Sequence, residues 1–506
     1  MDWLSPFSRI SSADIFKFLG LLFAIGAVIG LTALGAQVSA LFLGLLVLAL
    51  LAGLFVWLIA WDAYVALSLV LLSMPFHTIV QNRLEMAVQS ETGLLLFSTW
   101  KELALLAILA VVLASRILNK TGKLTLTFEL LVMLVFAAWG FVFILTANSL
   151  REGVLEYRNI YEGLLILLVM NFIRPPTTRV FKLLDWMVLE GVLISIWGVV
   201  TRFVIDFLTY LITFGFLPPE TTRETLELRS VYSISGNLFV RANSIFSGPN
   251  ELGLYLATLI VPVAALLLYR FSHLTNRQRV GYLLALPILL TGEMITISRN
   301  AWLLVAVALL VLYLRMRFTR RKFMITLLAA GSLIGLLMMV ENLWRFIRRT
   351  VNLWDTSAAA RVVVLENNLQ TFFSNPLGIG LGNASYKLYR LTEKYQHTEF
   401  YVFIIGLELG WIGLLLYFLV IGVFVRKCFL LTKPPYPFER RLLGLTGLAL
   451  LLGTFVSQFT AAISMEWIFQ IYLWFFVGAA VFIRREDRPY NAKHLQPDHM
   501  SGESFA

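Results

Sequence analysis

Cysteine and histidine are scarce in this sequence of 506 residues, which contains one cysteine and five histidines. A single cysteine, Cys428, excludes a disulfide framework and any site built from several thiolates. Five histidines along so long a chain leave too few ligands for a metal cage. We therefore expect neither a metal site nor another bound cofactor.

Charged residues are also scarce, at 14% of the chain, whereas an ordinary globular domain contains about 25%. Hydrophobic residues make up 59%, and the mean hydropathy is +0.81. These values exclude a soluble globular domain and a disordered chain. Long apolar runs recur along the sequence, whereas a transmembrane β-barrel would show short alternating segments. The sequence predicts an all-α polytopic membrane protein.

The apolar runs predict about 14 transmembrane helices, with 12 as the lower limit. The predicted spans cover residues 15–36, 40–61, 63–80, 98–116, 125–147, 154–173, 183–203, 249–270, 281–297, 301–315, 322–340, 399–425, 442–461 and 465–483. The resulting segments are N-terminal transmembrane helices (1–217), an outer loop (218–249), central transmembrane helices (250–340), a large outer loop (341–398), C-terminal transmembrane helices (399–483) and a cytoplasmic tail (484–506).

The formal net charge of +11 predicts how these helices are oriented. With the N-terminus in the cytoplasm, 25 of the 41 basic residues fall on the cytoplasmic side, and every short loop there is basic. Both termini are then cytoplasmic, and the two long loops lie outside. Because membrane orientation accounts for the positive charge, we expect membrane lipids and not nucleic acid as partners.

Local patterns predict structure in both outer loops. Two strand-like runs around Gly236-Asn237 predict a small β-hairpin. Residues 341–355 place their arginines on one helical face, which is typical of a helix lying in the membrane interface. Thr356-Ser357 predicts the start of a second helix. The glycine run within residues 375–382 favours a tight turn over a nucleotide-binding loop, because no βαβ unit surrounds it.

The outer side is rich in arginine, which supplies 13 of its 16 basic residues. A guanidinium group binds phosphate oxygens two at a time and does not lose its proton. Arginines at the outer ends of spans therefore suit a lipid-linked phosphate or diphosphate. The alternative is that they contact lipid head groups or extend their charged ends to the membrane surface.

Four of these arginines are candidate binding residues because of their positions. Arg158 lies within an otherwise apolar span, so it either has a function or forms a structural ion pair with Glu162. Arg241 precedes a predicted helix that begins near Asn250, where free backbone N–H groups also suit an anion. Arg299 lies in a polar break between two apolar runs, where the alternative is a plain turn, and Arg361 lies on the second loop helix.

His397 is the candidate catalytic base, because imidazole titrates near neutral pH and can accept a proton from a sugar hydroxyl. Glu399 follows within one helical turn, and the alternative is a structural histidine. Glu190, Glu293 and Glu408 lie within predicted spans and need partners or water. They are equally consistent with an ion pathway, which keeps a transporter open as an alternative function.

These residues resemble the motifs of the O-antigen ligase and O-antigen polymerase superfamily. The matching pieces are Arg241 with Phe246-Ser-Gly-Pro-Asn250, Thr296-Ile-Ser-Arg299, Arg361 with Asn375-Pro-Leu-Gly-Ile-Gly-Leu-Gly382, and His397-Thr-Glu-Phe400 with Glu408-Leu-Gly410. They occur in the family's order over roughly residues 230–425. The sequence departs from the family at Thr398, where Asn is common, and at 362–364, where the family often has Trp.

The resemblance implies a GT-C-like glycosyltransferase that is metal-independent and moves a glycan from undecaprenyl diphosphate to an acceptor hydroxyl. By this match, Arg241 and Arg299 would hold the diphosphate, Arg361 would support the loop or the donor, and His397 would be the base. One base and one displacement predict inversion at the anomeric carbon.

Position alone adds Arg158 to the diphosphate-binding candidates, and Asn250 and Glu399 are secondary candidates. The family implies the bacterial cytoplasmic (inner) membrane, with the active site on the periplasmic face. A ligase would use lipid A–core as acceptor, and a polymerase would extend a growing polysaccharide. The alternative is a transporter or flippase of a polyprenyl-linked or anionic solute, which predicts functional charges near the bilayer midplane and inverted repeats.

Overall fold

The computed structural model describes residues 40–87, 98–118, 126–217, 231–234, 237–271, 274–315, 356–385, 398 and 400–484. The predicted spans at 15–36 and 322–340, the interfacial helix predicted at 341–355 and the tail from 485 onward lie outside the described residues. The chain divides into two compact units, Met1–Asp62 and Ala63–Ala506, and every site described below lies in the second unit.

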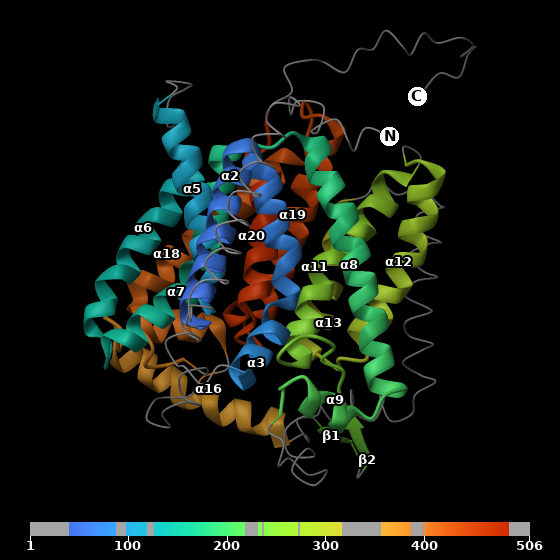
Figure 1. The fold of residues 1–506 in the computed structure, drawn as a ribbon. Helices are drawn as coiled ribbons and strands as arrows, with labels where there is room; N and C mark the ends of the chain where they lie inside the picture. The colour runs from blue at the N-terminus through green and yellow to red at the C-terminus, as the bar shows by residue number, and fades with distance from the viewer. Residues whose placement is uncertain are drawn as a thin grey trace, which may run out of the picture. The chain divides into compact units, whose positions relative to one another are not determined.

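Nearly all of the described chain is helical (Figure 1). The elements are α2 (Ala40–Ser73), η3 (Met74–Phe76), α3 (His77–Ala87), α5 (Trp100–Leu118), α6 (Phe128–Phe143), η4 (Ile144–Thr146), α7 (Leu150–Ile173), α8 (Thr177–Phe203), α9 (Phe207–Thr213), β1 (Val231–Ile234), β2 (Asn237–Val240), α11 (Pro249–Tyr269), α12 (Asn276–Met294), α13 (Arg299–Arg315), α16 (Thr356–Ser374), α18 (Tyr401–Leu431), α19 (Phe438–Ser457), η6 (Ile463–Met465) and α20 (Trp467–Phe482).

Six helices among the described residues are long and apolar enough to cross a membrane. They are Gly53–Leu84, Phe128–Thr146, Thr177–Phe203, Pro249–Tyr269, Tyr401–Leu431 and Phe438–Ser457. This finding supports the predicted class of helical membrane protein, but the predicted count of 14 spans is not confirmed. Asp62 is non-helical within α2 (φ −155°, ψ 99°), which agrees with the predicted boundary between the spans 40–61 and 63–80.

Helices α11 and α20 form the interior of the second unit and are buried over most of their length. Helix α11 packs against α12, α13 and α19, and α20 packs against α7, α11 and α19. Glycine allows the closest approach, since a Cβ atom on Gly163 of α7 would lie 2.0 Å from Cδ1 of Trp474 on α20. Within lipid, helices gain little from the hydrophobic effect and associate largely through van der Waals packing. Small residues favour this packing because they let the helix backbones approach closely.

The predicted β-hairpin is present between α9 and α11. Strands β1 and β2 pair antiparallel, with Val231 opposite Val240 and Ile234 opposite Asn237. Asn237, which the sequence placed in the turn, is the first residue of β2. The hairpin, α9 and α16 lie at the same end of the helices as α3 (Figure 1).

Helix α18 departs from the predicted uninterrupted span, because it is broken at Gly410 (φ +70°, ψ −172°). The glycine run fills this break as a tight turn. The amide of Ile379 donates to the carbonyl of Leu407 at 2.7 Å, and the amide of Trp411 donates to the carbonyl of Pro376 at 2.9 Å. A broken membrane helix must satisfy its freed backbone groups within the protein, and this turn does so.

We expect Gly410→Ala to lower the free energy of unfolding by about 2 kcal/mol or more, because its positive φ and its neighbours both oppose a side chain. A Cβ atom there would lie 2.6 Å from the carbonyl oxygen of Pro376. Gly422→Ala in the same helix is the matched control, because nothing lies within 4 Å of its Cβ position. Thermal unfolding of the purified variants in detergent tests this, and equal melting temperatures would contradict it.

Candidate functional site

Arg241 and Asn250 meet at the turn between α12 and α13. The Nε of Arg241 donates to the carbonyl of Thr296 at 2.7 Å, and its Nη2 donates to Oδ1 of Asn250 at 2.6 Å. The backbone adds a third link, since the amide of Ala242 donates to the carbonyl of Ile295 at 3.1 Å. The segment before α11 is therefore fixed to the turn that the sequence identified as a polar break.

The same turn presents Arg299, which is the first residue of α13, three positions after Thr296. Ile297 adopts a positive φ of 50°, so the chain reverses sharply between the two helices. Gly253 of α11 allows the approach, because a Cβ atom there would lie 2.9 Å from Oγ1 of Thr296. Arg241 and Asn250, from one matching motif, thus contact the turn after which Arg299, from another, begins α13.

The start of α11 already has a carboxylate beside it. Glu251 is buried and accepts hydrogen bonds from the amide of Ser247 at 3.1 Å and from its hydroxyl at 2.6 Å. A carboxylate in the first helical turn interacts favourably with the helix dipole. It therefore weakens the prediction that backbone N–H groups near Asn250 bind an anion, and leaves the arginine side chains as the anion-binding candidates.

Helix α9 supports the segment that follows Arg241. The hydroxyl of Tyr210 donates to the carbonyl of Ser244 at 2.7 Å, and the hydroxyl of Ser244 donates to the carbonyl of Ile194 on α8 at 2.9 Å. Burial raises the pKa of Tyr210 to about 12, so this hydroxyl keeps its proton at neutral pH. Ser244 has a positive φ of 49°, and these two hydrogen bonds hold the bend.

Glu408 fixes the glycine turn from inside the broken helix. Its Oε1 accepts a hydrogen bond from the amide of Ala384 at 3.0 Å, and its side chain is fully buried. Asn383, the residue before Ala384, accepts a hydrogen bond from Asn148 at 2.6 Å. The turn is therefore held by α18 and by the segment between η4 and α7, and Glu408 has a structural partner.

His397 and Glu399 lie outside the described residues, but Thr398 between them is described. Thr398 forms a β-bridge with Ser385 at the end of the glycine turn, and its Oγ1 accepts a hydrogen bond from the amide of Phe400 at 3.2 Å. The backbone of Arg361 lies in α16, as predicted, and its side chain is not described.

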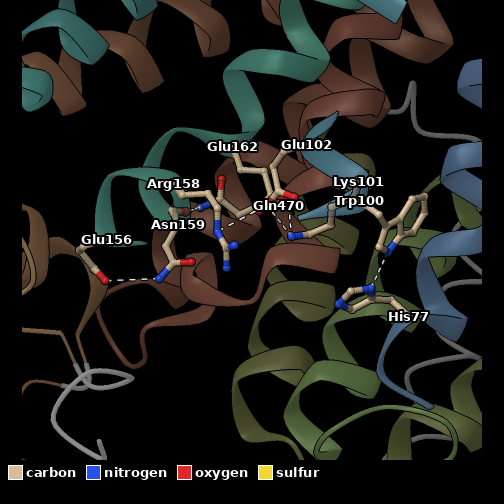
Figure 2. A network of polar contacts seen from close by, with 9 residues as sticks. All are labelled: His77, Trp100, Lys101, Glu102, Glu156, Arg158, Asn159, Glu162 and Gln470. Atoms are coloured by element: carbon tan, nitrogen blue, oxygen red, sulfur yellow. Dashed lines mark hydrogen bonds and ion pairs between the residues drawn. The ribbon is translucent and has the colours of Figure 1, made fainter. Parts of the chain in front are cut away.

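Arg158 belongs to a cluster of four charged residues on α5 and α7, shown in Figure 2. The Nζ of Lys101 lies 2.7 Å from Oε1 of Glu102 and 3.1 Å from Oε1 of Glu162. The Nε of Arg158 lies 3.4 Å from the same oxygen of Glu102. Of the two alternatives for Arg158, an ion pair is present, but its partner is Glu102 and not Glu162, which pairs with Lys101 from the neighbouring helix.

Aromatic rings and His77 surround this cluster. The indole of Trp100 donates to Nδ1 of His77 at 2.7 Å, and His77 lies edge-on to Trp467 with ring centres 4.6 Å apart. The Nζ of Lys101 lies 4.4 Å from the centre of the Trp467 ring, a cation–π distance. The sequence analysis missed Lys101 and Glu102, although they lie within the predicted span 98–116 and a charge within an apolar span was the signal that identified Arg158.

An apolar cavity of about 520 Å³ opens beside the Arg241 segment. Its wall includes Leu72 of α2, Trp186 and Trp197 of α8, and Ile245, which lies four residues after Arg241. Glu190 also lines it and accepts a hydrogen bond from the hydroxyl of Tyr255 at 3.3 Å. Among the described residues, no group of three or more His, Cys, Asp or Glu side chains could hold a metal ion.

Comparison with known proteins supports the resemblance stated from the sequence. A family model described as O-antigen ligase matches residues 283–418, which include Arg299, Arg361, His397 and Glu408. Arg241 and Arg158 precede the matched region. No curated protein matches the chain. The resemblance to the O-antigen ligase and polymerase superfamily is thereby confirmed for the matched region.

We expect Glu408→Gln to loosen the glycine turn, because its NH₂ group replaces one carboxyl oxygen at a buried position where Oε2 has no hydrogen-bond partner among the described residues. Amide hydrogen exchange at residues 382–385 should become about five- to tenfold faster. Glu366→Gln, at an exposed position of α16, is the control and should leave this exchange unchanged. Equal protection in both variants would show that the carboxylate does not hold the turn.

Proposed function

We propose that this protein is a membrane glycosyltransferase that moves a glycan from undecaprenyl diphosphate to an acceptor hydroxyl. The family match supports a ligase- or polymerase-like function, and the apolar helices support a multi-pass membrane location. The observation that carries the proposal is that Arg241 and Asn250 contact the turn after which Arg299 begins α13, so that two of the matching motifs lie side by side.

In the proposed reaction, the acceptor oxygen attacks the anomeric carbon of the donor sugar and displaces undecaprenyl diphosphate. The bond between the anomeric carbon and the phosphate oxygen breaks, and the diphosphate leaves with the electron pair. Arg241 and Arg299 stabilise the negative charge that develops on it, and Arg361 supports the donor. His397 accepts the proton of the acceptor hydroxyl. A single displacement inverts the anomeric carbon.

Asn250 has a positioning role in this proposal. Its Oδ1 accepts the Nη2 hydrogen bond of Arg241 at 2.6 Å, while the carbonyl of Thr296 fixes Nε. The guanidinium is thus oriented before substrate binds, which lowers the reorganisation needed in the transition state. Glu399 is retained as a secondary candidate for orienting His397.

The apolar cavity beside Ile245 suits the polyprenyl chain of the same donor. Its wall is almost wholly hydrocarbon, and it adjoins the segment that carries Arg241. A donor with its diphosphate at the arginines would then place its isoprenoid units against α2 and α8. The proposed site faces the periplasm, and lipid A–core is the first candidate acceptor, with a growing polysaccharide as the close variant.

Release of undecaprenyl diphosphate tests the proposed function directly. Purified protein with an undecaprenyl-diphosphate oligosaccharide should release the carrier only when an acceptor is present, and His397→Ala should lower the rate by at least about 100-fold. The size of the product separates a ligase from a polymerase. Donor binding without release, for every acceptor, would contradict the transferase and favour the flippase alternative.

Arg299→Lys should lose most of the activity, because lysine keeps the charge but lacks the planar fork that binds two oxygens. The expected decrease in kcat/KM is about 10- to 100-fold. Arg277→Lys is a suitable control, since Arg277 is exposed at the start of α12, away from the turn. Wild-type kcat/KM in Arg299→Lys would refute a bidentate role.

A further inference from the structure

We propose that Arg158 binds a second phosphate of the reactants, separately from the turn that carries Arg241 and Arg299. The inference rests on the proposed function, because it takes the substrates to be phosphate-bearing lipids. Lys101, Glu102 and Glu162 act as positioning residues, which hold Arg158 in place without contacting the ligand.

The guanidinium of Arg158 is only partly used within the cluster. Its Nε faces Oε1 of Glu102 at 3.4 Å without forming a hydrogen bond. Among the described residues, no hydrogen bond or ion pair involves its two terminal nitrogens, which Figure 2 shows turned away from Glu102. The side chain is 28% exposed, so a ligand can reach these nitrogens.

A purely structural ion pair would use the guanidinium differently. Arginine and carboxylate pair most strongly through two parallel N–H···O bonds from the planar fork. Here Lys101 lies closer to the shared oxygen of Glu102, at 2.7 Å, and it is itself 2% exposed. Lys101 therefore supplies most of the attraction to the carboxylate, and the fork of Arg158 stays available for a phosphate.

The cluster also has the charge balance of a preorganised site. Two cations, Lys101 and Arg158, and two anions, Glu102 and Glu162, cancel within it. Glu162 is 1% exposed at its side chain and contacts Lys101 at 3.1 Å. Because the buried charges neutralise one another, the partly exposed guanidinium of Arg158 can face a ligand without leaving an isolated charge in the interior.

The backbone beneath Arg158 is fixed by the opposite helix. The side-chain amide of Gln470 on α20 donates to the carbonyl of Asn159 at 3.1 Å and also to the carbonyl of Ser464. One turn further along α7, Gly163 lies directly against Trp474. Both contacts restrain the segment that carries Arg158, as a binding residue requires.

A chain of hydrogen bonds joins this segment to the other arginine turn. The hydroxyls of Ser457 and Thr460 donate to the backbone and side chain of Asn300, next to Arg299, at 3.3 and 3.1 Å. The amide of Gln458 donates to the hydroxyl of Ser464 at 2.5 Å. Residues 457–470 therefore contact both the segment that carries Arg158 and the start of α13, where Arg299 lies. One phosphate site on each side of residues 457–470 suits a donor and an acceptor that react with each other.

Two sources could supply the phosphate: the diphosphate of the polyprenyl donor or a phosphate on the acceptor. Direct binding to the full-length protein in nanodiscs separates them. The probes are undecaprenyl diphosphate without a glycan, phosphorylated lipid A–core, and the same lipid A–core after dephosphorylation. Arg158→Gln should weaken one phosphorylated probe by about tenfold or more and leave the dephosphorylated probe unchanged.

Weaker binding of undecaprenyl diphosphate alone identifies the donor as the source, and weaker binding of phosphorylated lipid A–core alone identifies the acceptor. Unchanged binding of both would overturn the proposal and leave the cluster a structural one. Arg151→Gln, at an exposed position on the same helix, is the control and should bind all probes as the wild type does. This experiment measures binding and not glycan transfer. A wild-type protein that binds the probes but transfers no glycan would therefore contradict the proposed function without contradicting the phosphate site at Arg158.

Variants that leave the net charge of the cluster unchanged distinguish a loss of binding from a folding defect. Arg158→Lys retains the charge beside Glu102 but lacks the fork, so it should keep the wild-type melting temperature and still bind phosphate less well. The double change Glu102→Gln with Arg158→Gln removes one anion and one cation together. If the role is structural, this pair restores phosphate binding along with stability, whereas a binding role leaves the loss in place.

Discussion

A helix broken within a membrane must find partners for the backbone groups it frees, and the break in α18 at Gly410 finds them in the glycine turn. This contact sets the position of much else. It places Glu408 against the amide of Ala384, and it brings Ser385 beside Thr398, the residue between His397 and Glu399. Thr398, the residue that follows the candidate base, is therefore held against a turn that exists because the helix is interrupted.

The connection between α19 and α20 helps to fix the helices that carry Arg299 and Arg158. The hydroxyl of Thr460 in this connection donates to Asn300, and its buried Ser464 accepts hydrogen bonds from Gln458 and from Gln470 of α20, which also donates to the carbonyl of Asn159. A polar segment at that depth is stable only when its groups are paired. Because the partners lie on α13 and α7, satisfying the segment also fixes the two helices that present Arg299 and Arg158.

Sequence patterns with a local cause predicted the structure well. The helix start at Pro249, the polar break before Arg299 and the hairpin each depend on a few adjacent residues, and all three are present. Partners from distant helices could not be predicted in the same way. Glu162 was the partner considered for Arg158 in the structural alternative because both lie on one helix, but Glu162 pairs with Lys101 from α5.

The break in α18 was not predicted either, because Glu408 and Gly410 within the apolar run do not by themselves show that the helix is interrupted, and the residues packed against Gly410, such as Pro376, lie elsewhere in the sequence. A glycine is tolerated in many membrane helices without interrupting them. The interruption becomes favourable only because residues 376–380, from the large outer loop that precedes α18, form hydrogen bonds with the backbone at the break.

The charged cluster also bears on how the protein is made. Lys101 and Glu102 are adjacent on α5, and Arg158 and Glu162 are one helical turn apart on α7, so each helix carries its own opposite charges. The opposite charge on the same helix partly offsets the cost of inserting Lys101 and Arg158 into the bilayer. When the two helices meet, Lys101 keeps Glu102 and also gains Glu162, and Arg158 gains Glu102, so the ion pairs between the helices form only on assembly.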